Sequence, residues 1–141
     1  MKQEVTKRLP VRKRRLNLDD HKCSVLTTLR IFATKWKPCI ICYLGEQPLR
    51  YNDLYRIVPN ISRKMLSGHL REMQADGLII RKQFDPKKQH VEYGLSEKGM
   101  SLLHILEDIQ DWGLQNLPGV LSIKEMIYLC NENVIASIPP D

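Results

Sequence analysis

The 141-residue sequence lacks several features that mark whole classes of protein. No apolar run approaches the roughly 18 residues that predict a membrane-spanning helix. The basic amino terminus is not followed by the apolar stretch of a secretory signal, so we expect a cytoplasmic protein with no membrane partner. The sequence also has no internal repeat, no low-complexity stretch and no glycine-rich phosphate loop.

Cysteines are few and irregularly spaced, at Cys23, Cys39, Cys42 and Cys130, which makes reduced thiols the default. Cys39 and Cys42 form a C-x-x-C on a predicted helix. Because no second pair could complete a zinc site and no strand precedes the motif, we interpret them as small residues that face the core. His69 and His104 have no companion ligands and are interpreted as structural, so we expect no metal site and no cofactor.

The size and composition fit one globular domain, because 43% of the residues are hydrophobic and 27% are charged. We find no Ser/His/Asp order worth pursuing and no paired carboxylates in a recognisable setting. Glu107, Asp108 and Asp111 cluster on one predicted helix, but a solvated acidic face explains them more simply. The sequence therefore predicts a protein that is not an enzyme.

The positive charge is unevenly distributed. Residues 1–15 carry seven Lys or Arg and one acid, which equals the whole net charge of +6. Residues 50–90 have nine Lys or Arg and four acids, a balance of +5, whereas residues 91–141 have two and eight, a balance of −6. One part of the chain is therefore suited to an anionic partner and the other is not.

Residues 1–16 combine Lys and Arg clusters with Pro10 and predict a flexible basic arm, either a solvated tail or a phosphate-binding arm. Apolar spacing then predicts helices over about 24–33, 37–44 and 51–58. Gly45 would end the second as a left-handed cap, and Pro59 would end the third.

The stretch 60–95 carries the strongest pattern. Leu66, Leu70 and Met73 predict one buried face of a helix over about 62–76, with Ser62 as N-cap and Gly77 after its end. Strands are predicted over about 78–84 and 90–95, joined by a turn at 85–88. A helix-turn-helix followed by a two-stranded hairpin predicts a winged helix, of mainly helical α+β class.

Candidate DNA contacts follow from that arrangement. The outward residues of the second helix have donors suited to phosphates and base edges, and the hairpin tip is basic. An ordinary solvated helix face and a normal turn composition are the competing interpretations. The candidate contacts are Ser62, Arg63, Lys64, Ser67 and Arg71 on the helix, Lys87, Lys88, Gln89 and His90 at the tip, and Arg50, with Arg56 as a further backbone contact.

Another helix is predicted from Ser96 to about Trp112, with an apolar stripe wider than a small monomeric core needs. Such a stripe suggests a dimer interface, and the residues that form it are Leu102, Leu103, Leu106, Ile109 and Trp112. From Pro118 onward, residues 118–141 form a carboxy-terminal extension. Its Ser122 and Glu125 have capping-box spacing, which predicts one further helix to about Asn131.

In addition, the chain resembles the HxlR-type winged-helix transcriptional regulators, a bacterial group related to the MarR regulators. The similarity covers about residues 23–113, and it depends on an ordered set of short motifs. These are Cys23, Lys35-Trp36, Leu49 to Leu54, Ile61 to Ser67, Leu70 to Met73, Asp76 to Ile79, and Val91 to Gly99.

The resemblance implies a homodimeric DNA-binding regulator with a winged-helix domain over residues 17–117 and flanking dimerisation helices. It also implies a possible redox sensor, because in some members the cysteine that matches Cys23 senses oxidants or electrophiles. Lys22 and a helix start beside Cys23 would favour a reactive thiolate, and a quiet, partly buried thiol is the alternative.

We therefore predict a nucleoid-associated regulator that binds double-stranded DNA as a homodimer at a pseudo-palindromic site. The rival interpretation is a winged-helix module for protein contacts only, as a co-regulator or anti-repressor. The basic balance of residues 50–90 argues against that rival. The sequence assigns no small-molecule effector.

Overall fold

The computed structural model describes residues 23–85, 87–88 and 90–136, with side chains up to Leu129. This part of the chain contains six α-helices and a three-stranded antiparallel sheet, so the predicted α+β, mainly helical class is confirmed. The chain divides into two compact units, with the boundary between Ile31 and Phe32. The predicted basic arm, residues 1–16, lies outside the described residues.

Helix α1, Ser24–Phe32, belongs almost wholly to the first unit. It begins directly after Cys23, whose carbonyl accepts a hydrogen bond of 2.8 Å from the amide of Thr27. The apolar side chains Val25, Leu26 and Leu29 are 63%, 38% and 40% exposed. The helix was predicted correctly, and several of its apolar side chains are exposed.

In the second unit, helices α2 (Lys37–Glu46) and α3 (Tyr51–Ile57) supply much of the core. Ile40, Ile41 and Leu54 are completely buried. The prediction that Gly45 ends α2 was wrong, because the helix continues to Glu46 and Gln47 is extended. A side chain at Gly45 would collide with Leu103 of helix α5 (Glu97–Asn116), so this glycine permits close packing of two helices.

Helix α4, Arg63–Ala75, has the predicted caps. The Ser62 hydroxyl accepts a hydrogen bond of 3.1 Å from the amide of Met65, and Gly77 has the left-handed φ of +74°. Asn60 also has a positive φ, of 58°, in the turn before α4. The indole of Trp36 donates to the carbonyl of Pro59 at 3.0 Å, which fixes that turn to the start of α2.

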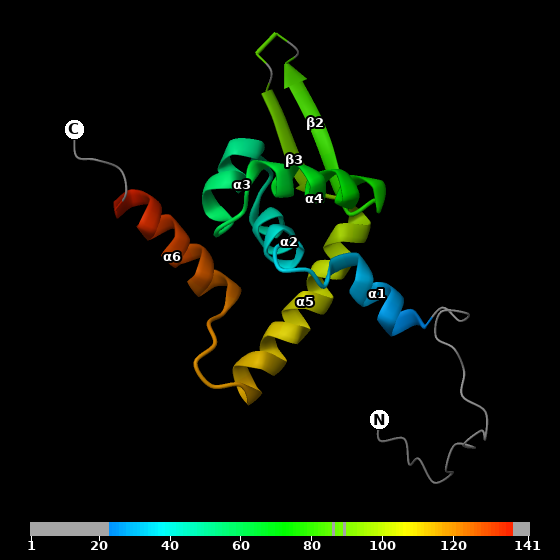
Figure 1. Cartoon of the computed structure of the whole chain (residues 1–141), viewed down its shortest axis with the longest axis vertical. Coiled ribbons are helices and arrows are strands. Elements are labelled where there is room, and N and C mark those ends of the chain that lie inside the picture. Colours follow the sequence, from blue (N-terminus) through cyan, green and yellow to red (C-terminus); the bar gives the residue numbers. More distant parts are fainter. Residues whose placement is uncertain (1–22, 86, 89, 137–141) are drawn as a thin grey trace. The chain divides into compact units, whose positions relative to one another are not determined.

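The sheet has the order β1-β3-β2, with every pairing antiparallel. Strands β2 (Ile79–Asp85) and β3 (His90–Leu95) form the predicted hairpin, which projects beyond α3 and α4 (Figure 1). The two-residue strand β1, Leu49–Arg50, was not predicted, because two residues are too short to show a period. The register shifts between Gln83 and Asp85, so Phe84 forms a bulge near the hairpin tip.

Helix α5, Glu97–Asn116, is capped as predicted by Ser96, whose hydroxyl accepts a bond of 3.0 Å from the amide of Gly99. It is longer than predicted, because it continues through Gly113 and ends only near Pro118. The capping box before helix α6 (Ile123–Ala136) is confirmed by bonds of 2.7 and 3.2 Å between Ser122 and Glu125. No helix within the described residues is long and apolar enough to cross a membrane.

Candidate nucleic-acid interface

The outer face of α4 carries the cations that the sequence predicted. Arg63, Lys64 and Arg71 are exposed, whereas Leu66 and Leu70 on the opposite face are at most 2% exposed. The helix is thus divided into a buried apolar face and an outward basic face. Ser62 is also exposed, but its hydroxyl caps the helix.

Tyr51 of α3 connects the two helices of the helix-turn-helix. Its hydroxyl donates to the carbonyl of Arg63 at 3.0 Å and lies 3.0 Å from the hydroxyl of Ser67. Because the tyrosine has one hydroxyl proton and donates it to Arg63, the Ser67 hydroxyl must donate to Tyr51. Ser67 therefore positions α4 against α3. The sequence analysis missed Tyr51 because a single tyrosine at a helix start has no distinctive spacing.

The guanidinium groups of α4 are held by further local contacts. Arg63 lies over the ring of Tyr55, 4.3 Å from its centroid, and donates to the side-chain oxygen of Asn52 at 3.4 Å. Arg71 donates from Nε to the carbonyl of Ser67 at 3.4 Å. A guanidinium that is already oriented loses less conformational entropy when it binds a phosphate or a base.

A chain of side chains connects the base of the wing to its tip. The Arg50 guanidinium donates to Nδ1 of His90 at 2.9 Å, and Nε2 of His90 lies 2.9 Å from Glu92 Oε1. Since Nδ1 accepts, the neutral imidazole carries its proton on Nε2 and donates it to Glu92. The structure thus brings together Arg50 and His90, two predicted contact residues that are 40 positions apart.

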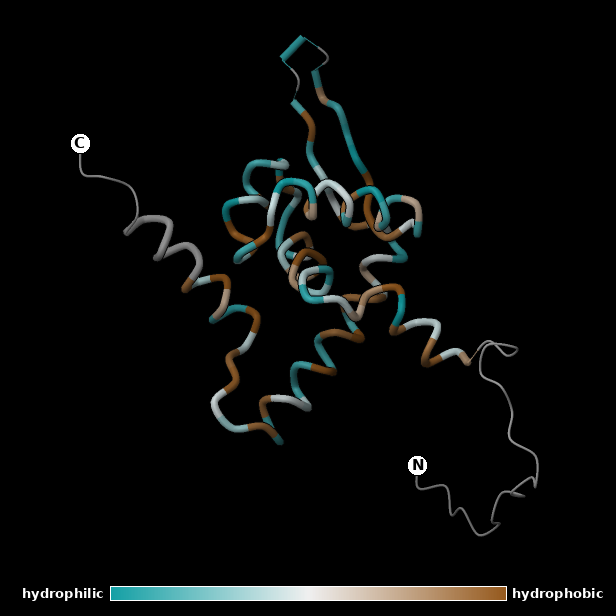
Figure 2. Tube along the Cα trace, viewed as in Figure 1, coloured by the Kyte–Doolittle hydropathy of each residue, from teal (hydrophilic) through white to brown (hydrophobic). Residues whose placement is uncertain are grey.

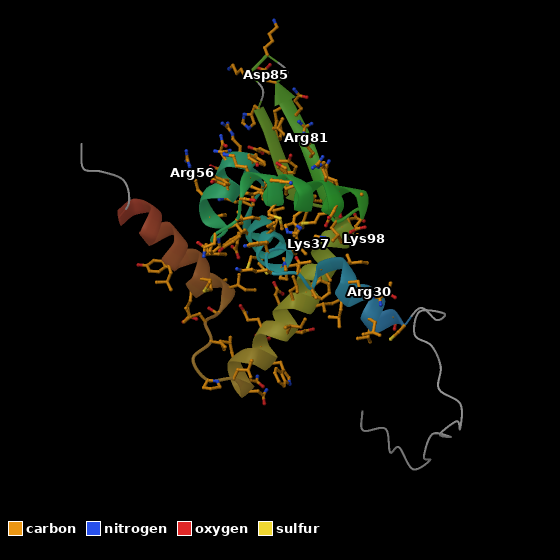
Figure 3. All side chains as sticks on the ribbon, in the orientation of Figure 1. Arg30, Lys37, Arg56, Arg81, Asp85 and Lys98 are labelled. Carbon is orange, nitrogen blue, oxygen red and sulfur yellow. The ribbon has the colours of Figure 1, made fainter. Side chains whose placement is uncertain are left out.

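Lys87 and Lys88 are exposed at the wing tip, where their amides donate to Asp85 at 2.9 and 3.2 Å. Gln89, the fourth predicted tip residue, lies outside the described residues. Arg81 (Figure 3) and Lys82 add exposed cations along β2, and neither was predicted as a contact residue. Cations therefore extend along the wing as well as at its tip.

Behind α4, Lys37 connects this helix to α2. Its ammonium is buried and lies 2.5 Å from the exposed carboxylate of Glu72. The hydrogen bond and the charge of Lys37 lower the pKa of Glu72 below its ordinary value. His69 is buried beside them, with its ring 5.8 Å from that of Trp36, in accord with a structural position.

The remaining predicted residues belong neither to α4 nor to the wing. Within the stripe of α5, Leu102, Leu103 and Leu106 are at most 8% exposed and belong to the core of the single chain, whereas Ile109 and Trp112 are 51% and 61% exposed. Cys23 is partly exposed, Cys39 is partly exposed and Cys42 is buried. Among the described residues, no group of three or more His, Cys, Asp or Glu side chains could hold a metal ion.

Comparison with known proteins gives a consistent result. A family model described as HxlR-like helix-turn-helix matches residues 31–120. The regulatory protein MalR of Fusobacterium mortiferum is 42% identical over 97 residues, which cover 68% of this chain and 92% of MalR. The HTH-type transcriptional regulator YtcD of Bacillus subtilis is 41% identical over 97 residues, which cover 69% and 77% of the two chains.

Solved structures are similar over the same region. The redox regulator HypR in its oxidised form superposes with a TM-score of 0.62 and 35% identity, covering 67% of this chain and 97% of HypR. The reduced form of the regulator YodB from B. subtilis gives a TM-score of 0.63 and 26% identity, covering 71% of this chain and 99% of YodB.

Proposed function

Because this chain belongs to the HxlR-like helix-turn-helix family of transcriptional regulators, we propose that it is a homodimer that binds a pseudo-palindromic DNA site in a sequence-specific way. The relatives are regulators and not enzymes, and helix-turn-helix regulators of this family bind DNA. Binding at such a site would also make the protein nucleoid-associated.

One observation carries this proposal: the outward basic face of α4 lies beside a basic wing, and α3 holds α4 in place. Arg63 and Arg71 are the best candidates to contact base edges in the major groove, and Lys64 would lie close to the sugar-phosphate backbone of the DNA. Lys87, Lys88 and Arg50 are placed to neutralise phosphates, which fix orientation but carry no sequence information. Ser62 and Ser67 contribute by positioning the helix.

A homodimer is supported by apolar side chains that the single chain leaves exposed. Ile109 and Trp112 of α5 are more than half exposed, and so is Val25 of α1. Burying such side chains against a second copy would remove apolar area from water. A two-fold dimer would then place two recognition helices about 34 Å apart, one turn of DNA.

Cys23 is the proposed site of regulation. Its partial exposure and its position immediately before α1 permit reaction with an oxidant. Of two similar regulators, HypR has been solved in an oxidised form and YodB after treatment with the thiol oxidant diamide. Modification there would shift the dimer between arrangements that differ in DNA affinity. A Cys23→Ser protein should keep its DNA affinity in the presence of diamide. An unchanged response to diamide would exclude this residue as the sensor.

The test of DNA recognition is a fluorescence-anisotropy titration on DNA from upstream of the protein's own gene, against a scrambled duplex, across a salt series. We expect tight, salt-sensitive binding that survives excess scrambled competitor. Weak and equal binding to both duplexes would instead support the protein-interaction module. Sedimentation of the free protein and of the complex would measure whether two chains bind one duplex.

A further inference from the structure

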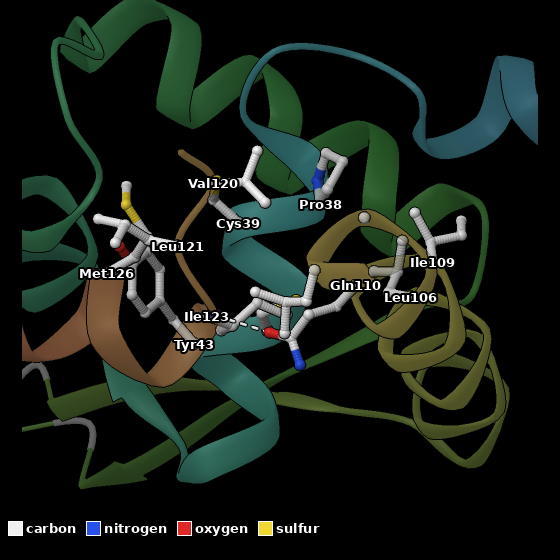
Figure 4. Close-up of a pocket in the computed structure, with 13 residues that line it drawn as sticks. Pro38, Cys39, Tyr43, Leu106, Ile109, Gln110, Val120, Leu121, Ile123 and Met126 are labelled. Carbon is white, nitrogen blue, oxygen red and sulfur yellow. Dashed lines mark hydrogen bonds between the residues drawn. The ribbon is translucent and has the colours of Figure 1, made fainter. Parts of the chain in front are cut away.

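A cavity of about 270 Å³ lies between α2, α5, the connection after α5 and the start of α6 (Figure 4). Pro38 and Cys39 line it from α2, Leu106 and Gln110 from α5, and Ile123 and Met126 from α6. The side-chain oxygen of Gln110 already has a partner within the protein, because it accepts a hydrogen bond of 2.5 Å from the amide of Ile123. This bond fixes the first turn of α6 to α5.

The lining has almost no charge to offer a ligand. No Lys, Arg, His, Asp or Glu is among the described residues that line the cavity. Burial, and then the neighbouring Cys39, raise the pKa of Cys42 to about 12, so its thiol stays neutral. A carboxylate or an ammonium group entering this space would lose its hydration without gaining a counter-ion.

We propose that this cavity binds an uncharged, mostly apolar small molecule with one or two rings. The volume lies between the roughly 150 Å³ cavity that holds benzene and the roughly 300–1,000 Å³ of pockets for drug-sized ligands. The lining is mainly aliphatic, with the ring of Tyr43, the thioether of Met126 and the amide of Gln110 among its other groups. It offers dispersion contacts and no counter-charge, which selects a neutral ring over an aromatic acid.

The carboxy-terminal extension completes the site. The family match ends at residue 120, whereas Leu121, Ile123 and Met126 close one side of the cavity. Two contacts position that side: the capping box of Ser122 and Glu125, and the bond from Ile123 to Gln110. The carboxy-terminal extension therefore forms one side of the site, and the family-matched region forms the rest.

A connection to DNA binding rests on the proposed function. Pro38 and Cys39 directly follow Lys37, the buried cation that holds Glu72 of α4. A ligand that moves the first turn of α2 would therefore alter the support of the recognition helix. By linkage, ligand and DNA would change each other's affinity by the same factor.

Binding is tested first on the free full-length protein, with the neutral two-ring fluorescent probe prodan, 6-propionyl-2-(dimethylamino)naphthalene, and no DNA. We expect saturable, one-to-one enhancement of fluorescence that benzoate does not displace and that neutral naphthalene does. Met126→Glu, which adds a carboxylate to the lining, should weaken binding by about 10-fold or more. Leu129→Glu is the matched control, because Leu129 is similarly exposed on α6 but does not line this cavity.

A second pair of variants tests the cavity independently, in case Met126→Glu does not fold. Gly113 lines the cavity on α5, and a Cβ there would meet no atom within 4 Å, so a side chain can begin there without a clash at its first carbon. Gly113→Leu should fill the space and abolish probe binding, while Gly113→Ala should retain it. Thermal unfolding of all four variants identifies any that fail to fold.

Equal probe affinity in Met126→Glu and Leu129→Glu, or in Gly113→Leu and the parent, would overturn the proposal. So would preference for benzoate over naphthalene, or fluorescence that never saturates. DNA anisotropy without probe is a separate measurement, so a protein that fails to bind DNA could still bind the probe, and the reverse. Probe binding that leaves DNA affinity unchanged would overturn only the connection through Lys37.

Discussion

The winged-helix half of the second unit and its carboxy-terminal half differ in the charge and the hydropathy of their residues. Residues 50–90 have a balance of +5, nine cations less four acids, whereas residues 91–141 have −6, two cations less eight acids. On the first, exposed cations accompany a hydrophilic wing, and on the second, exposed apolar residues gather along α5 and the connection to α6 (Figure 2). One surface suits a polyanion, and the other suits an apolar partner or ligand.

The two halves also differ in how their surfaces are organised. The cations of α4 and the wing are held by polar contacts, such as those from Asn52 to Arg63 and from His90 to Arg50. The exposed apolar side chains of α5, such as those of Ile109 and Trp112, would instead be stabilised by contact with another apolar surface. Substitutions on the basic surface should therefore change DNA affinity with little change in the free energy of unfolding. Substitutions in the core beneath it should mainly lower the free energy of unfolding.

The largest expected effect tests the inner face of α4. Leu70 is 2% exposed, and Leu70→Ala should reduce the free energy of unfolding by about 2–5 kcal/mol, because it removes buried methyl groups and leaves a cavity. Lys64→Ala, on the outer face of the same helix, should change stability by no more than about 0.5 kcal/mol. Urea denaturation measures both, and equal losses would contradict the division of α4 into two faces.

Two glycines of α5 should respond with opposite sign. A Cβ at Gly99 would collide with the carbonyl oxygen of Leu78, so Gly99→Ala should cost about 1–3 kcal/mol of stability. Gly113 has open space, and Gly113→Ala should stabilise by up to about 1 kcal/mol through helix propensity. Thermal unfolding of the two variants gives the comparison, and a shift in the same direction would contradict the packing described for Gly99.

On the DNA-facing surface, Arg71→Ala should weaken binding to the specific duplex by about 1–3 kcal/mol and leave the unfolding free energy nearly unchanged. Lys124→Ala is the matched control, because Lys124 is an exposed cation on α6. Anisotropy on specific and scrambled duplexes separates recognition from general attraction. Equal losses on both duplexes would assign Arg71 to the phosphate backbone.

Sequence reasoning succeeded where a local signal repeats or caps an element. The caps Ser62, Gly77 and Ser96 and the buried face of α4 were predicted, because each depends on residues a few positions apart. Gly45 was misjudged because its neighbour, Leu103, is distant in the sequence. A glycine that ends a helix and one that admits another helix look alike until the packing is known.

The candidate site was predicted as a set of donors, and its supports were not. Tyr51 and Asn52, which hold Ser67 and Arg63, act across two helices, and the Arg50 to His90 contact joins residues 40 positions apart. The stripe of α5 was interpreted as one surface. The fold divides it instead, because α2 covers the residues near Leu103 and leaves Trp112 exposed.

The ion pair between Lys37 and Glu72, behind α4, should make the free energy of unfolding decrease at acid pH. The pKa of Glu72 is lowered in the folded chain, so its contribution is complete above the ordinary value of 4.5 and is lost as the pH falls through the lower folded value. Glu72→Gln should therefore lose less stability between pH 7 and acid pH than the parent. Denaturation across this range measures it. Lys37→Met should flatten the profile too, and a Glu72→Gln profile as steep as the parent's would contradict the pairing.

The smallest expected effect separates the wing tip from α4. Lys88 is exposed beyond the recognition helix, so Lys88→Ala should remove one phosphate contact and reduce the slope of log K against log salt by about 0.9. The ratio of specific to scrambled affinity should stay unchanged, since phosphates carry no sequence information. An altered ratio with an unchanged slope would place Lys88 at a base edge and the wing inside a groove. The basic half would then read sequence with two elements instead of one.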